Sequence, residues 1–278
     1  MLRTIATLVV VALVTIACAT SPTGRRQLML VSEDQAIASS KEAYVQSMGK
    51  LKAEGKLVSD PKLLARVEQI TERLVAQAVR MRPDSARWEW SVEVIDEPKT
   101  VNAWCMAGGR MAVYTGLILK VDPTDDELAQ VMGHEIAHAL ANHTAEKMSV
   151  SMASQLGVIA AGMASDKPGQ TMAIAAAAAA LAVQMPNSRT AEAEADRIGI
   201  ELAAKAGYDP KAAATLWQKM GAVGGNGPPA FLSTHPGPEQ RQQKLAQLEP
   251  KMRPFYEAAG TPPTHPVLIG VAATSAGT

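Results

Sequence analysis

The stretch Val131-Met132-Gly133-His134-Glu135-Ile136-Ala137-His138 places the pattern H-E-x-x-H within a segment of helical periodicity. An α-helix turns by about 100° per residue, so His134 and His138 project from one face and can share a metal ion. Glu135 follows the first histidine directly, where its carboxylate can accept a proton from a water molecule at the open coordination position. The spacing therefore predicts two zinc ligands and a general base.

The residues before this motif predict where its helix begins. Thr124 and Glu127 have the spacing of a capping box, and the apolar residues after them supply one face of a helix that runs into the motif. The alternative is a structural helix that carries two surface histidines. A capped, apolar helix leading into the motif argues against that alternative.

A catalytic zinc usually has three protein ligands, so a third must be sought. His143 lies about 140° around the helix from His138 and cannot reach the metal unless the helix ends sharply, so we expect a packing or helix-terminal role for it. Downstream, Glu192 and Asp196 share a face of a second helix, in the E-x-x-x-D arrangement of the gluzincins. In that arrangement the Glu completes the zinc sphere and the Asp hydrogen-bonds a ligand histidine. Glu194 points about 200° away and is expected to be solvated. The alternative is that all three acids are ordinary charges on a helix surface. The presence of the H-E-x-x-H motif argues against this alternative.

Three spaced motifs carry a family resemblance. H-E-I-A-H, then S-R-T-A-E-A-E-A-D-R-I-G from residue 188, then S-T-H-P from residue 233 with Arg241 after it, resemble the zinc metallopeptidases that include the CAAX prenyl protease and the heat-shock protease HtpX. The chain is more closely similar to their periplasmic, lipoprotein-type bacterial members, over about residues 32–249.

The resemblance implies one zinc ion per chain. Its ligands would be His134, His138 and Glu192, with Glu135 as the base. It also implies that His235 lies over the metal, either stabilising the oxyanion or capping the zinc in a closed, latent form. From spacing alone His235 is an ordinary loop histidine.

The N-terminal residues predict export. Residues 1–17 carry Arg3 and then an apolar run, which is typical of a secretory signal peptide. T-I-A-C at residues 15–18 resembles a bacterial lipobox, in which Cys18 is lipidated; ordinary signal cleavage at these small residues is the alternative. We expect a periplasmic protein with a lipid anchor in an envelope membrane, and Ala19 after the cysteine favours the outer membrane by analogy with lipoprotein sorting. Cys105 then has no partner and is expected to be a buried or free thiol.

Composition and periodicity predict the fold class. The 278 residues have no net charge and 47% apolar content, which is enough for one substantial core, and no basic patch or aromatic platform suggests nucleic acid. Helices are expected at 32–54 and 60–80. Residues 88–94 alternate like a strand with one buried face, and two further strands flank the Gly pair at 108–109.

We therefore expect an α+β, mainly α-helical, zincin-like metallopeptidase domain with a small antiparallel sheet beside the active-site helix. Residues 1–18 form the signal peptide with its lipobox, 19–31 a tether, 32–249 the domain and 250–278 a Pro/Ala-rich, loosely ordered tail.

Substrate contacts are suggested by the resemblance. In the family, the strand ending near such a Gly pair lies along the active-site cleft and pairs with the substrate backbone, which makes Asn102 and Ala103 candidates. Arg241 is a separate candidate, either for binding substrate or for anchoring the loop that carries His235. A covered hairpin and a solvated helix Arg are the alternatives. Ala107 stands where family members often carry Pro, which leaves the end of the strand open.

Two Ala-rich runs, residues 148–164 and 171–185, predict close-packed helices beside the active site. A membrane hairpin is the alternative, but the second run is shorter than the roughly 20 apolar residues that spanning needs.

Together these features predict a zinc-dependent endopeptidase at the periplasmic side of an envelope membrane. Misfolded or unassembled envelope proteins are the expected substrates, from the resemblance alone. A zinc-stabilised chaperone or assembly factor with latent proteolysis is the alternative, with His235 in the fourth coordination position. A structural membrane protein built on the Ala-rich runs is a third and weaker possibility.

Overall fold

The computed structural model describes residues 18–163, 165, 167–184, 189–223, 229–235 and 238–270. The expected signal peptide at 1–17 lies outside the described residues, as do most of the Gly/Pro-rich stretch before His235 and the last part of the tail. The chain divides into two compact units, one of residues 1–36 and 142–185 and the other of residues 37–141 and 186–278.

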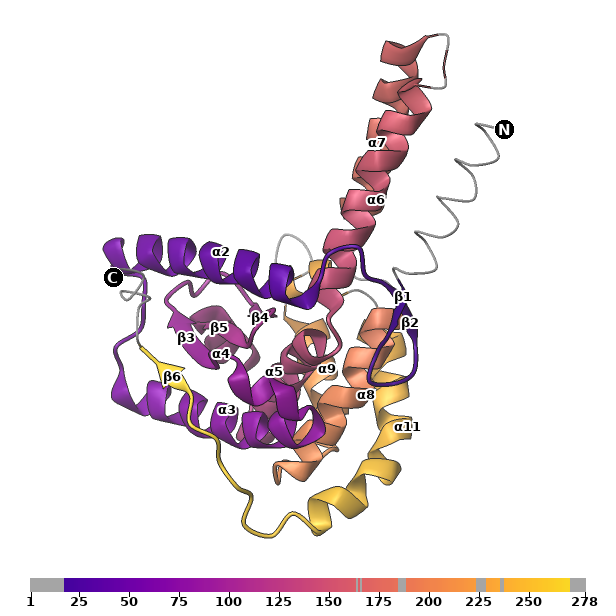
Figure 1. Ribbon diagram of the computed structural model, residues 1–278. Helices are drawn as coiled ribbons and strands as arrows, with labels where there is room; N and C mark the ends of the chain where they lie inside the picture. Colours follow the sequence, from indigo (N-terminus) through magenta and orange to yellow (C-terminus); the bar gives the residue numbers. More distant parts are fainter. Residues whose placement is uncertain are drawn as a thin grey trace. The chain divides into compact units, whose positions relative to one another are not determined.

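The first unit combines a small β-hairpin with two Ala-rich helices. Strand β1 (Cys18–Thr20) pairs antiparallel with β2 (Arg26–Leu28), and α6 (His143–Met163) packs against α7 (Pro168–Gln184). A Cβ at Gly162 would lie 2.3 Å from Met172 Cγ, so the absence of a side chain permits this close packing. The two helices expected from the Ala-rich runs are confirmed (Figure 1). Among the described residues, no helix combines the length and apolar character that membrane spanning requires.

The helices of the second unit begin largely where their capping residues predict. Asp60 accepts from the Lys62 amide, and Thr124 and Glu127 form the expected reciprocal capping box. The second unit contains, besides the 3-10 turn η1 (Pro83–Arg87) and most of α2 (Glu33–Ala53), the helices α3 (Pro61–Met81), α4 (Thr115–Val121), α5 (Asp125–Leu140), α8 (Arg189–Lys205), α9 (Ala212–Ala222), α10 (Ala230–Thr234) and α11 (Pro238–Glu257).

The sheet of this unit is mixed rather than antiparallel. Its strands are β3 (Ser91–Ile95), β4 (Ala103–Met106), β5 (Arg110–Tyr114) and β6 (Leu268–Ile269), in the order β4-β5-β3-β6. Only β4 and β5 are antiparallel, whereas β3 runs parallel to both β5 and β6. The reason is topological: the chain leaves β3, forms β4 at the sheet edge and returns as β5 between the two. The fold class, mainly helical with a small sheet, is confirmed.

Strand β3 is buried on both faces, so the expectation of one buried face was wrong. On one face Ile95 and Ala112 pack with Tyr44 and Met48 of α2, and the opposite face carries Val92 and other core residues with α3 and α5 (Figure 1). Strict alternation in the sequence indicated a solvated face that α2 in fact covers.

The tail is ordered as far as it is described, which corrects the expectation for residues 250–270. Helix α11 continues through Pro250 and Pro254, and β6 adds a strand to β3. Met252 and Val267 are buried, so isolated apolar residues hold this segment where no periodic pattern could be seen. Residues 271–278 lie outside the described residues.

Candidate metal centre

Helix α5 carries the first three residues of the site, and all three are buried in the protein. His134, Glu135 and His138 are each buried, with 4–6% of their surface exposed. The capping box fixes where α5 begins, and the helical spacing then places both histidine rings on one face, with centroids 4.7 Å apart. The two Nε2 atoms lie 3.1 Å from each other.

Two glycines bring the second part of the site against the first. A Cβ at Gly199 of α8 would lie 2.8 Å from the backbone N and Cα of His134, and one at Gly133 of α5 would lie 2.9 Å from the Gly199 carbonyl oxygen. The backbones of α5 and α8 therefore touch at this crossing. Sequence analysis assigned neither glycine a role, although Gly133 directly precedes His134 and Gly199 ends the motif that begins at residue 188.

Four side chains converge on one point. Ligand-type atoms of His134, His138, Glu192 and His235 all lie within 4.8 Å of one another, and all four residues are buried. Glu192 Oε2 is 3.5 Å from His134 Nε2, and its Oε1 is 3.5 Å from His138 Nε2. His235 presents Nδ1 at 2.9 Å from Glu192 Oε1 and 3.3 Å from His134 Nε2.

These separations fit zinc. Tetrahedral ligands at a metal distance of about 2.0–2.1 Å are about 3.3 Å apart, close to the observed values. Burial and the Arg241 guanidinium favour neutral His134, yet the carboxylates of Asp196 and Glu192 raise its pKa to about 9. The carboxylates that stabilise a proton here would equally stabilise a divalent cation. The donor set of imidazoles and one carboxylate is the set that zinc prefers.

Asp196 and Arg241 support the cluster from outside. Asp196 Oδ1 lies 3.1 Å from His134 Nδ1, so it can accept the Nδ1 proton and leave Nε2 facing the cluster. Arg241 Nε donates to Asp196 Oδ2 at 2.9 Å, its Nη2 pairs with Asp196 Oδ1, and its Nη1 lies 2.9 Å from Glu192 Oε2. Despite burial, these partners hold the pKa of Asp196 below its usual value.

Arg241 is therefore an internal positioning residue in this structure, with 5% of its surface exposed. Its side chain pairs with Asp196 and Glu192, and the substrate contact that the sequence suggested for it stays a prediction. Its guanidinium also lies 3.8 Å from the centroid of the Trp217 ring. A solvated Arg, the other expectation, is excluded by the same burial.

Glu135 faces the cluster without a hydrogen bond at one oxygen. Its Oε1 is buried and has no hydrogen-bond partner among the described residues, and His235 Nε2 lies 3.4 Å from it. Burial raises the pKa of Glu135, against the opposing effect of the neighbouring histidines. A buried carboxylate with an oxygen free of hydrogen bonds, beside a metal cluster, is suited to exchange a proton with a water molecule there.

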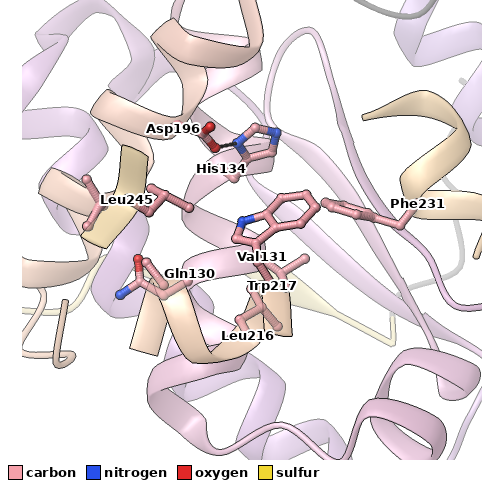
Figure 2. A pocket seen from close by; sticks show the side chains of 10 residues that line it. Gln130, Val131, His134, Asp196, Leu216, Trp217, Phe231 and Leu245 are labelled. Atoms are coloured by element: carbon pink, nitrogen blue, oxygen red, sulfur yellow. Dashed lines mark ion pairs between the residues drawn. The ribbon is translucent and has the colours of Figure 1, made fainter. Parts of the chain in front are cut away.

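Aromatic residues that the sequence did not indicate hold His235 and His134. The Phe231 ring stacks on His235 at 4.5 Å between centroids, and its backbone N–H donates to the Val101 carbonyl. Figure 2 shows the Asp196 carboxylate against His134, with the Trp217 and Phe231 rings nearby. The short helix α10 thus ties the His235 segment to the chain just before β4. An aromatic residue four positions before a histidine is too common a pattern to predict this packing from the sequence.

Strand β4 carries the weaker substrate candidates. It is one of the two edge strands of the sheet, with β6 at the other edge, and it contacts α5. The Asn102 carbonyl accepts from the Tyr114 amide, its buried Oδ1 has no hydrogen-bond partner among the described residues, and Ala103 is buried. Neither residue belongs to the metal cluster. Cys105 on the same strand is a buried free thiol, as expected, and burial raises its pKa further above that of an exposed thiol.

Two other expectations concern residues outside the cluster. Glu194 is buried, with 4% of its surface exposed, so the prediction of a solvated side chain was wrong. Helix α8 packs against α3, α5 and α11, which leaves little of its circumference in solvent. His143 opens α6 in the first unit and is not a member of the metal cluster, in line with its expected packing or terminal role.

Comparison with known proteins agrees with a metallopeptidase site. The model of peptidase family M48 matches residues 61–249. The chain is 34% identical over 253 residues to the mitochondrial metalloendopeptidase OMA1 of Homo sapiens, covering 87% of this chain and 47% of that protein. It is 40% identical over 159 residues to OMA1 of Arabidopsis thaliana, covering 57% and 31% respectively. With the beta-barrel assembly-enhancing protease of Escherichia coli it shares 29% identity over 214 residues, covering 74% and 42%. The chain thus spans half or less of the length of these curated relatives.

Proposed function

The chain belongs to peptidase family M48, a family of zinc metallopeptidases, and from this premise we propose that it is an endopeptidase of the bacterial cell envelope. The observation that carries the proposal is the convergence of His134, His138 and Glu192, with Glu135 beside them, whose buried Oε1 has no hydrogen-bond partner among the described residues. Zinc, when bound by these three ligands, polarises a peptide carbonyl and lowers the pKa of water towards about 7.

The chain's own residues perform the remaining steps. Glu135 Oε1 accepts a proton from the attacking water and later donates it to the amine that leaves. Asp196 keeps the Nδ1 proton on His134, which orients the ring and its Nε2 lone pair. Arg241 holds Asp196 and Glu192 in place through its guanidinium. The burial of all these groups limits competing solvent at the site.

We propose that substrate binds at the outer edge of β4, which pairs with β5 on its other side. A peptide in extended conformation can add to an edge strand through backbone hydrogen bonds, which reads little sequence and suits unfolded chains. Asn102 and Ala103 lie at the start of that edge. Misfolded or unassembled envelope proteins fit this mode of binding. The name of the E. coli relative, a beta-barrel assembly-enhancing protease, supports an envelope role.

The location is proposed from the sequence. The apolar segment at residues 5–16 and T-I-A-C at 15–18 support export and lipidation at Cys18, with the outer membrane as the favoured destination. Polypeptide substrates and an envelope membrane are thus the proposed partners.

A second candidate is a latent form of the same protein, acting as a zinc-stabilised chaperone or assembly factor. The position of His235 favours it, because Nδ1 lies 2.9 and 3.0 Å from the two Glu192 oxygens and occupies the place of a fourth ligand. A protein in this state binds zinc and does not cut until His235 moves.

One experiment separates the two candidates. The chain without residues 1–17 and its Glu135→Gln variant are compared for cleavage of an unfolded protein, with bound zinc quantified in both. We expect the parent to cut and the variant to keep zinc but lose cleavage, since only the base has been removed. If both proteins bind zinc and neither cuts, the His235→Ala variant of the parent is tested next. Cleavage by that variant would establish latency. Failure of the folded parent to bind zinc would contradict both candidates.

A further inference from the structure

Helix α6 carries a stripe of large apolar side chains in solvent, which we define as Met152, Leu156, Ile159 and Met163. These residues are spaced i, i+4, i+7 and i+11, so they fall within about 60° of one another around the helix. Each is between 44% and 84% exposed. We propose that this stripe is a membrane-binding surface that lies in the interface of a lipid bilayer, as a second contact besides any lipid on Cys18.

The stripe is free of charge along its whole length. No Asp, Glu, Lys or Arg occurs from residue 149 to 163, nor from 171 to 184 in the neighbouring α7. Ile174 of α7 is also exposed, at 66%. Water is a poor solvent for such a surface, and an exposed row of Met, Leu and Ile marks a site of interaction.

The dimensions favour lying on a bilayer over crossing it. From Met152 to Met163 the stripe is about 17 Å long, and no helix of the described chain has the length and apolar character to span a membrane. An apolar helix face of this size buries itself to a depth of about 5–10 Å at the headgroup boundary.

The first turns of α6, which precede the stripe, are bonded to the N-terminal segment after Cys18, and the choice of a bilayer as the partner rests on the lipidation of Cys18 proposed above. Arg25 binds Glu146 of α6 with two hydrogen bonds of 2.7 and 2.6 Å, and Gln27 donates to the same carboxylate at 3.0 Å. The Val31 amide donates to the buried Ser149 hydroxyl at 2.9 Å. These bonds fix the first turns of α6 to the N-terminal hairpin.

That hairpin begins at Cys18, which pairs with Leu28. Leu28 is followed three residues later by Val31, a span of at most about 11 Å. A lipid carried by Cys18 would therefore reach the bilayer within a short distance of the base of α6. This continuity is why we assign the stripe to a bilayer and not to a second copy of the chain, which the N-terminal segment gives no reason to expect.

The test uses the full chain in vesicles of phosphatidylethanolamine and phosphatidylglycerol. Single variants Leu156→Cys and Ile159→Cys are labelled with a polarity-sensitive fluorophore, and quenching by brominated acyl chains is measured. Val150→Cys is the matched control on the same helix, because Val150 is exposed but lies about 120–180° around the helix from the stripe. Leu119→Cys on α4 is an exposed apolar control in the second unit. The labelled parent gives the background from native cysteines.

We expect brominated lipid to quench positions 156 and 159 about twofold or more, and positions 150 and 119 little above background. Equal quenching at 150 and 156 would overturn a one-sided surface. Absence of quenching at both stripe positions would overturn membrane contact. An emission shift at 156 that appears without vesicles and grows with protein concentration would assign the stripe to a second copy instead. None of these readings depends on peptidase activity, so the inference can fail while the proposed function stands.

Discussion

Replacing Gly199 by Ala tests whether the close crossing of α5 and α8 sets the metal site. The added Cβ would lie 2.8 Å from His134 Cα and N, and 3.0 Å from the Gly133 carbonyl carbon. Carbon atoms in contact prefer about 3.5–4.0 Å, so the helices must separate locally by roughly 0.7–1.2 Å. The obstructing atoms belong to the backbone of α5 and cannot rotate away.

This displacement is large for a metal site, whose geometry is held to within about 0.5 Å. Since α5 carries His134 and His138 and α8 carries Glu192, we expect zinc affinity to fall by about 10- to 100-fold. The free energy of unfolding changes less, because overpacking costs about 1–3 kcal/mol while Ala in a helix gains about 1 kcal/mol over Gly.

The assay is competition for zinc against a chelator, with urea unfolding of the same samples. Gly49→Ala in α2 is the matched control, because a Cβ there meets no atom within 4 Å. We expect that control to keep the parent's zinc affinity and to gain about 0.5–1 kcal/mol of stability. If Gly199→Ala binds zinc as tightly as the parent and is stabilised like Gly49→Ala, the crossing does not position the ligands.

Three further predictions concern Glu93, Trp217 and Glu146. Burial raises the pKa of Glu93 to about 7 against the opposing charge of Lys52, so the parent's stability falls as pH rises from about 4.5 to about 7, where only the unfolded chain ionises readily. Glu93→Gln removes that fall, so the melting temperature of the variant relative to the parent should be higher at pH 7.5 than at pH 5. A difference in melting temperature that is the same at both pH values contradicts the reasoning. Trp217→Ala removes a buried ring that packs on Arg241 and Phe231, and should lower the free energy of unfolding by about 3–5 kcal/mol in urea titrations; a loss below about 1 kcal/mol would show that the site collapses around the gap. Glu146→Gln breaks the paired bonds that hold the N-terminal hairpin to α6, so hydrogen exchange of amides 18–31 should accelerate by about tenfold, while that of α3 amides stays unchanged.

Local patterns predicted the elements that carry the ligands. The capping box at Thr124 and Glu127 fixed the start of α5, and the spacing of His134 and His138 fixed their common face. The E-x-x-x-D spacing in the same way put Glu192 and Asp196 on one side of α8. These predictions succeed because caps and side-chain faces depend on the backbone within about four residues.

Contacts between distant segments were not predictable in this way. The parallel pairing of β3 with β5 and β6 joins residues far apart in the chain, and the covering of its second face depends on α2. The ordered segment at 250–270 is held by single buried residues such as Met252, without a periodic pattern. Strand order and coverage are decided by which surfaces can pack together, which a window of sequence does not contain.

The sequence by itself determined the helices, two histidine ligands, a candidate third ligand and a general base, because each follows from helical geometry over a few residues. Only the tertiary structure decided that Glu192 meets the histidines through the contact of Gly133 with Gly199, and that Arg241 is an internal support. The tertiary structure also decided that His235 reaches the ligand cluster. The physical reason is that helix spacing is fixed by backbone hydrogen bonds between near neighbours, whereas a meeting of helices from distant parts of the chain is set by the close packing of their surfaces.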